Sequence, residues 1–209
     1  MIDTWPWHLA RLMPEYEHIN KAMGSQGNGL ISRGIIYEVS KQLKEHHSDD
    51  IRVGIMWSGS DRHQVYSDEP LGENTDSWFE NPTGFIDNHK TWQILNHHWT
   101  NKKSDIYYKF LHTDMYGWIQ TLENILRTQW FLEKYNIKYF MSTFMKLFRD
   151  MPVTKETTHL WEMIDWDKFL PIPGMHEWCD NSELDSDQHP LQPAHEKFVK
   201  EVITPFGFK

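Results

Sequence analysis

Apolar residues along this chain recur at the spacings of helices and of buried strands. Helical spacing occurs in four segments, at about residues 5–13, 30–46, 105–134 and 192–203. Residues 51–57 are apolar at nearly every position after Arg52, as in a strand covered on both faces, and residues 137–143 form a second predicted strand. Helices that alternate with strands favour right-handed crossovers, so the pattern predicts an α/β fold with a parallel sheet.

Between these elements lies a polar stretch. Residues 58–103 are rich in Gly, Pro, Asn and Asp and have weak periodicity, which predicts a long loop or insertion over one end of the sheet. In an open parallel sheet, sites form where loops leave the carboxyl ends of the strands. The loops at 24–29, at 57–62 and after Ser142 are therefore expected to converge on the loop that carries His189.

Composition narrows the function classes. A chain of 209 residues suffices for one domain, so residues 1–209 are interpreted as a single domain. The formal charge of −9 argues against a nucleic-acid partner or an anionic membrane surface. The only cysteine, Cys179, excludes an internal disulfide and fits a reducing compartment. With no signal peptide and no apolar run of about 18 residues, a cytoplasmic location without a membrane partner is expected.

Four short blocks carry candidate chemistry. They are Trp5-Pro6-Trp7-His8-Leu9-Ala10, then Asn20 with Met23-Gly24-Ser25-Gln26-Gly27-Asn28, then Met56-Trp57-Ser58-Gly59-Ser60-Asp61-Arg62, and finally Asp187-Gln188-His189-Pro190 with His195. In order and spacing these blocks resemble the SGNH (GDSL-type) hydrolases over almost the whole chain, and most closely the small phage and marine-viral members. The resemblance implies a flavodoxin-like three-layer α/β/α fold and hydrolysis of an acyl or acetyl ester on a carbohydrate or lipid, with no cofactor.

The same resemblance implies a role for each candidate residue. His189 would be the general base that activates a serine, and Asp187 would orient its imidazole, with Asp185 as the other carboxylate available. Gly24, the Ser25 amide and the Ser60 hydroxyl would serve the oxyanion hole, with Ser60 where the family has an asparagine. Asp61 and Arg62 would bind substrate or form a surface pair.

One block of the family pattern is missing. No strand and no Gly-x-Ser precede Trp5, so the first strand and the nucleophile are expected to be absent. A shortened form of a longer protein explains this better than a degenerate relative, because losing the innermost strand would expose neighbouring strand edges. The chain as given is expected to be inactive, in the cytoplasm of an infected host cell or on a virion.

Three alternatives stay open. A zinc site could use His176, Cys179, His189 and His195. A non-catalytic viral structural protein could hold glycan on aromatic loops around Trp78, Phe79, Trp92 and Trp99. Finally, Ser58 or Ser142, both at predicted strand ends, could be the nucleophile. The residues do not indicate the oligomeric state.

Overall fold

The computed structural model describes residues 4–22, 24–67, 91–95 and 102–208. The helices are α1 (Trp5–Leu12), α2 (Asn28–Gln42), α3 (Lys102–Phe110), α4 (Asp114–Lys134), α5 (Lys155–Glu162), α6 (Met175–Trp178) and α7 (Gln192–Phe198). The strands are β1 (Arg52–Trp57), β2 (His63–Ser67), β3 (Thr91–Leu95) and β4 (Lys138–Thr143). Short turns of 3-10 helix stand at Ser48–Asp50, Trp166–Lys168 and Asn181–Glu183, and the π-helical turn η5 (Val199–Ile203) continues α7.

The two predicted strands pair in parallel, as the alternating pattern indicated. β1 and β4 run in register from Arg52 opposite Lys138 to Trp57 opposite Thr143. On the other edge of β4, Phe169 forms a parallel bridge with Met141. The opposite edge of β1 pairs with no strand in the part of the chain that the structure describes. The general α/β class with a parallel sheet is therefore confirmed.

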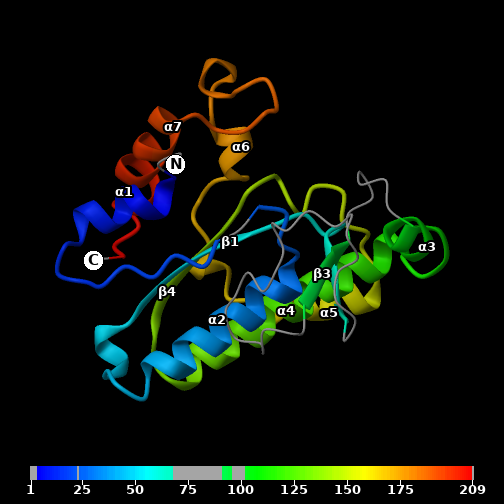
Figure 1. The fold of residues 1–209 in the computed structure, drawn as a ribbon, viewed down its shortest axis with the longest axis horizontal. Helices are drawn as coiled ribbons and strands as arrows, with labels where there is room; N and C mark the ends of the chain where they lie inside the picture. The colour runs from blue at the N-terminus through cyan, green and yellow to red at the C-terminus, as the bar shows by residue number, and fades with distance from the viewer. Residues whose placement is uncertain (1–3, 23, 68–90, 96–101, 209) are drawn as a thin grey trace.

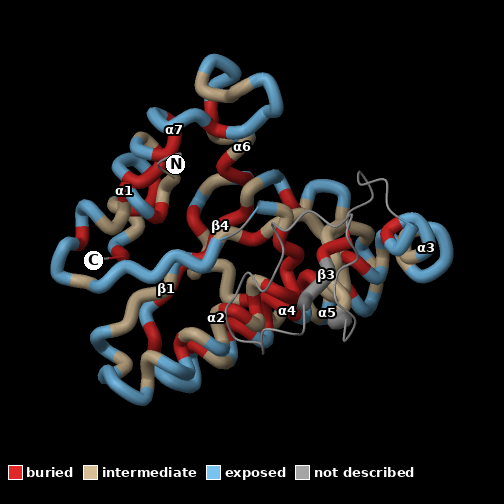
Figure 2. Tube along the Cα trace, in the orientation of Figure 1, coloured by how far each residue is buried: buried red, intermediate tan, exposed pale blue. Residues whose placement is uncertain are grey.

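Helices cover both faces of this sheet because successive side chains of a strand point to opposite faces. On one face, Trp57 and Met141 pack with the buried residues of α2 and α4 and with partly buried residues of α5. On the other face, Phe140 packs with Phe198 and the rest of the α1, α7 and η5 layer. Figure 1 shows α1 and α7 on one side of β1 and β4, and α2, α4 and α5 on the other. Figure 2 shows buried residues along the sides of these elements that face inward.

The polar stretch 58–103 contains more regular structure than its composition suggested. β2 and β3 lie within it and form a two-stranded antiparallel ribbon, with His63 opposite Leu95. These strands were not predicted because each is only five residues long and neither has a regular alternation of apolar and polar positions. Three of the aromatic residues proposed to hold glycan, Trp78, Phe79 and Trp99, lie outside the described residues, as does the side chain of Trp92.

The single helix predicted over 105–134 is wrong, because the chain breaks between α3 and α4. Thr113 has an extended backbone and its hydroxyl accepts a hydrogen bond from the Tyr116 N–H at 3.2 Å. Threonine is a strong helix N-cap because its side chain satisfies an amide that has no partner within the helix. The apolar periodicity runs through this boundary unchanged, so only the capping residue marked it.

We expect Thr113→Ala to lower the free energy of unfolding by about 1 kcal/mol, because the Tyr116 amide loses its acceptor. Urea unfolding monitored by circular dichroism measures this. Thr113→Ser keeps the acceptor oxygen and serves as the control. Equal stabilities for the alanine and serine variants would show that the cap does not stabilise α4.

Candidate functional site

A tight turn shapes the loop that carries His189. The Asp185 N–H donates to the His189 carbonyl at 2.8 Å, and the Gln188 N–H donates to the Asp185 carbonyl at 3.1 Å. Gln188 closes this turn with φ of 63°, a left-handed conformation that is uncommon for residues other than glycine. Of the three described non-glycine residues with positive φ, Ser25 and Gln188 both lie in loops that the sequence marked as candidate sites. Such strained positions persist where surrounding structure holds them, often near functional sites.

The turn brings the Asp185 carboxylate to the His189 imidazole. His189 Nδ1 lies 3.9 Å from Asp185 Oδ1, and that oxygen also accepts from the His189 and Asp187 N–H groups at 2.8 and 2.9 Å. Hydrogen bonding from the His189 amide, reinforced by that from Asp187, holds the pKa of Asp185 below its usual value. Asp185, rather than Asp187, therefore stands where the orienting carboxylate was expected.

This pair stands at the carboxyl ends of both parallel strands. The ring of His189 lies 6.0 Å from that of Phe144, the residue that follows β4. The Phe144 N–H in turn donates to the Trp57 carbonyl at the end of β1, at 2.9 Å. About a third of the Asp185 side chain and most of the His189 side chain are exposed, at 39% and 64%. The imidazole is thus open to a ligand at the edge where sites in parallel sheets form.

Asn28 joins the two other predicted site loops. Its side chain, which is almost fully buried, accepts from the Ser58 N–H at 2.8 Å. The same side chain donates to the Ser58 carbonyl at 3.0 Å and to the Thr121 hydroxyl at 3.1 Å. The start of α2, the end of β1 and α4 are therefore held together by one amide. The loops at 24–29 and 57–62 therefore contact each other, and their convergence on the loop that carries His189 stays a prediction.

Glycines allow the close approach between these loops. A Cβ at Gly27 would stand 2.5 Å from the Gln64 side chain and would also collide with the Arg62 carbonyl. Arg62 Nη1 donates to the Ser58 hydroxyl at 3.0 Å, so the arginine folds back over its own loop. Any larger residue at position 27 would separate α2 from the β1–β2 loop.

The remaining predicted residues take different positions. Gly24 and Ser25 form the turn before α2, and the space beside Gly24 is open. The Ser60 carbonyl faces α4, where a Cβ at Gly117 would stand 2.5 Å from it. The Asp61 carbonyl accepts from the Tyr108 hydroxyl at 2.5 Å. The backbone of residues 60 and 61 is thus anchored to α3 and α4, and no described hydrogen bond joins this loop to His189.

The proposed zinc ligands do not form a cluster. Within the described residues, no group of three or more His, Cys, Asp or Glu side chains could hold a metal ion. His176 lies 3.6 Å from Glu177, whereas His195 is buried in α7. Burial, together with the nearby Glu183 carboxylate, raises the pKa of the Cys179 thiol to about 11, which disfavours the thiolate that binds zinc.

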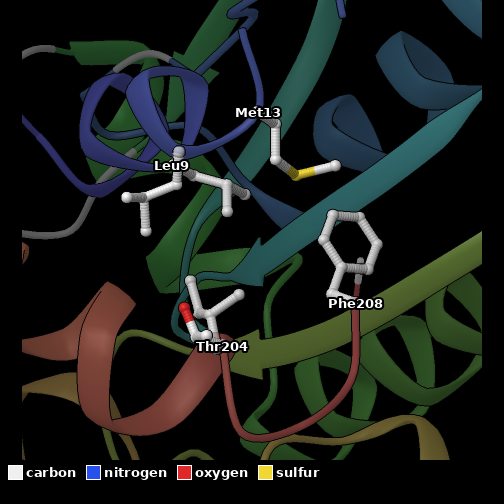
Figure 3. A pocket seen from close by; sticks show the side chains of 6 residues that line it. Leu9, Met13, Thr204 and Phe208 are labelled. Carbon is white, nitrogen blue, oxygen red and sulfur yellow. The ribbon is translucent and has the colours of Figure 1, made fainter. Parts of the chain in front are cut away.

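Two cavities differ greatly in what they could hold. The first, between α1 and the C-terminal segment, has a volume of about 10 Å³ and could hold about one water molecule. Figure 3 shows Leu9 and Met13 on one side of this cavity and Thr204 and Phe208 on the other. The second is a groove of about 720 Å³ beside the end of β4, within the usual size range of ligand pockets.

Two features of these regions were not predicted from sequence. One is the groove, whose walls come from segments that are distant along the chain. The other is a buried pair of imidazoles, His8 in α1 and His195 in α7, each with a ring nitrogen that has no partner among the described residues. Burial, with a further contribution from His8, lowers the pKa of His195 to about 4. No local sequence pattern marks either feature, because both depend on packing between helices.

Comparison with known proteins gives a family match over nearly the whole chain. Residues 1–206 match DUF6071, a family of unknown function. No curated protein and no solved structure matches the chain. Across its described residues, the protein has no helix with the length and apolar character needed to cross a membrane.

Proposed function

The chain belongs to the DUF6071 family of unknown function, and from its geometry we propose that it is an ester hydrolase of the SGNH type on a flavodoxin-like fold. The observation that carries the proposal is the Asp185 and His189 pair at the carboxyl ends of β1 and β4, with Nδ1 3.9 Å from Oδ1. A carboxylate that faces one imidazole nitrogen leaves the other free to accept a proton, which is the arrangement of a general base.

In the proposed reaction, His189 removes the proton of a serine hydroxyl as that oxygen attacks the ester carbonyl. The Asp185 carboxylate stabilises the imidazolium that forms, and the imidazolium then protonates the departing alcohol. Water attacks the acyl enzyme with the same base, which releases the acid and restores the serine. The Gly24 and Ser25 amides and the Ser60 hydroxyl are the proposed donors to the oxyanion, and Asp61 and Arg62 are the proposed substrate contacts.

The nucleophile of the proposed reaction would be a serine close to the His189 imidazole. Asp185 is the one described side chain in ion-pair or hydrogen-bond range of the His189 imidazole. Ser58 follows β1, and its oxygen accepts from Arg62 at 3.0 Å; Ser142 lies near the end of β4. Within the described residues, no serine side chain lies in hydrogen-bond range of the His189 imidazole. This lack of a nucleophile beside the base favours the second candidate function, a non-catalytic glycan-binding protein on the same fold.

Intact mass after treatment with a fluorophosphonate separates the two functions, because this reagent modifies serines that a nearby base activates. Because the family's nucleophile block is missing from the chain as given, activity requires Ser58 or Ser142 in its place. In that case one adduct per chain is expected, with turnover of p-nitrophenyl acetate above the buffer rate. His189→Ala should remove the adduct and lower turnover about 100-fold or more, the contribution usual for a general base. Asp185→Asn should lower turnover without removing the imidazole.

The matched control is His176→Ala. His176 lies 6.4 Å from the same Phe144 ring but outside the proposed pair, so this variant should keep both adduct and turnover. Peptide mapping of the adduct would identify the serine. A folded protein with neither adduct nor turnover would contradict the hydrolase and favour the glycan-binding protein.

A further inference from the structure

The groove beside β4 is built by two segments that flank the end of that strand. Ser142 and Thr143 stand at the strand end, and the groove continues along the residues that follow. The facing wall is the segment 166–173, which the bridge between Met141 and Phe169 holds against the free edge of β4. Phe206 closes the groove from the C-terminal segment. Hydrogen bonds and buried packing therefore fix both walls.

A packed set of aromatic rings from both walls lines the groove. Trp166 lines the groove, and its ring lies 3.8 Å from that of Trp161 behind it. Phe148 and Phe169 also line the groove and lie 5.3 and 4.9 Å from Trp166. All four rings are only partly buried although they pack against the core. Fixed aromatic faces of this kind accept the flat side of a ring, with little loss of side-chain entropy on binding.

A hydroxyl group in the groove has no partner. Ser142 is 2% exposed, and its Oγ makes no hydrogen bond within the described chain. Its neighbour differs, because the Thr143 hydroxyl donates to the Pro173 carbonyl at 3.2 Å. A buried hydroxyl without a partner is destabilising, and because Ser142 lines the groove, we assign a bound ligand as its partner.

The charges along the groove are opposite in sign to the protein as a whole. Lys146 and Arg149 line it against a single carboxylate, Asp167, in a chain of formal charge −9. Arg149 reaches only its exposed neighbour Asp150, at 3.9 Å, and Lys146 forms no ion pair with any described residue. Exposed pairs such as the first contribute little, so both cations can take an external anion.

We propose that this groove binds a ligand that has a flat ring and an anionic group. The ring would lie against Trp166, the carboxylate or phosphate would lie at Lys146 and Arg149, and Ser142 would hydrogen-bond the ligand. The site stands on its own observations and does not depend on hydrolysis at His189, because binding is measured without turnover.

Isothermal titration with 2-naphthoate, 2-naphthyl phosphate and the neutral 2-naphthalenemethanol tests the site, and D-glucuronate against D-glucose tests a saccharide ring. We expect at least one anion to bind about tenfold or more tightly than its neutral counterpart. The Lys146→Ala and Arg149→Ala double variant should lose that difference. Both side chains are on the surface, so the variant should keep its thermal midpoint.

Lys168→Ala is the charge control. Lys168 belongs to the segment 166–173, which forms a wall of the groove, but its side chain does not line the groove. It should leave the affinities unchanged. Ser142→Ala should weaken the anion and the neutral compound alike. Equal affinity for charged and neutral compounds, no binding by either, or the same loss of affinity in Lys168→Ala would each overturn the proposal. The preferred anion identifies whether carboxylate or phosphate, and aromatic or saccharide ring, is recognised.

Discussion

Lowering the pH from about 6.5 to about 4.5 is expected to destabilise the protein steeply. Burial is the main cause that lowers the pKa of His195 and of His63 to about 4. The imidazole of His8 further lowers the pKa of His195, and that of His112 further lowers the pKa of His63. In each case a second positive charge nearby would repel the first. In opposition, the Pro190 carbonyl favours protonated His195, and Asp61 favours protonated His63. Burial prevails in both cases.

The sign follows from the direction of these shifts. A histidine whose folded pKa lies below its unfolded value binds fewer protons in the folded state, so stability is complete above about pH 6.5 and is lost as pH falls towards 4. The gap between 6.5 and about 4 corresponds to at most about 3.5 kcal/mol per histidine. The value is smaller for His63, which is only partly buried, whereas His195 is buried. The carboxylates with lowered pKa values, such as Asp185, titrate below this window.

Urea unfolding at pH 7, 6 and 5 measures this loss of stability. His195→Gln is expected to reduce the pH slope by about half, because one of the two shifted groups is gone. His47→Gln is the control, since His47 is 74% exposed and should leave the slope unchanged. An unaltered slope in His195→Gln would mean that His195 does not titrate with folding.

Asn28→Ala is expected to lower the free energy of unfolding by about 3 kcal/mol. The change removes an acceptor from the Ser58 N–H and a donor from the Ser58 carbonyl and the Thr121 hydroxyl. Asn28 is 3% exposed, so the groups left behind would be shielded from water. Buried polar groups without partners are among the few causes of large mutational effects.

The matched control for that variant is Asn20→Ala. The Asn20 side chain also accepts a backbone hydrogen bond, from Ala22 at 2.9 Å, but on the surface. Its loss should change stability by about 0.5 kcal/mol or less. Thermal unfolding of both variants checks the difference. Similar effects from the two would contradict the role of Asn28 in joining α2, β1 and α4.

Local patterns predicted the helices and strands whose apolar residues follow one regular spacing along the whole element. The apolar run at 51–57 and the periodic segments at 5–13, 30–46 and 192–203 became β1, α1, α2 and α7 with η5, within a few residues. The order of these elements also predicted the parallel pairing of β1 with β4, because a helical crossover between two strands favours it. The ribbon of β2 and β3 was missed because its strands are only five residues long and are separated in sequence by residues 68–90.

The sequence also proposed a candidate site. The sequence identified His189 and the loops around Gly24, Ser60 and Asp61, and the structure places all of these among the loops at one end of the sheet or next to α2. It favoured Asp187 as the orienting carboxylate, whereas Asp185 is the one that faces His189, because the turn depends on the left-handed conformation of Gln188, which glutamine seldom adopts.

By itself, the sequence determined the general class of fold and the strands of the parallel sheet, and it proposed His189 as a base. These follow from the spacing of apolar residues and from the chemistry of one side chain, both of which are local along the chain. Only the tertiary structure decided that Asp185 faces His189, that Asn28 holds two loops together, and that Ser142, Trp166 and two cations share a groove. Each of these depends on contacts whose geometry is set by packing and turn conformation, which residue spacing does not encode.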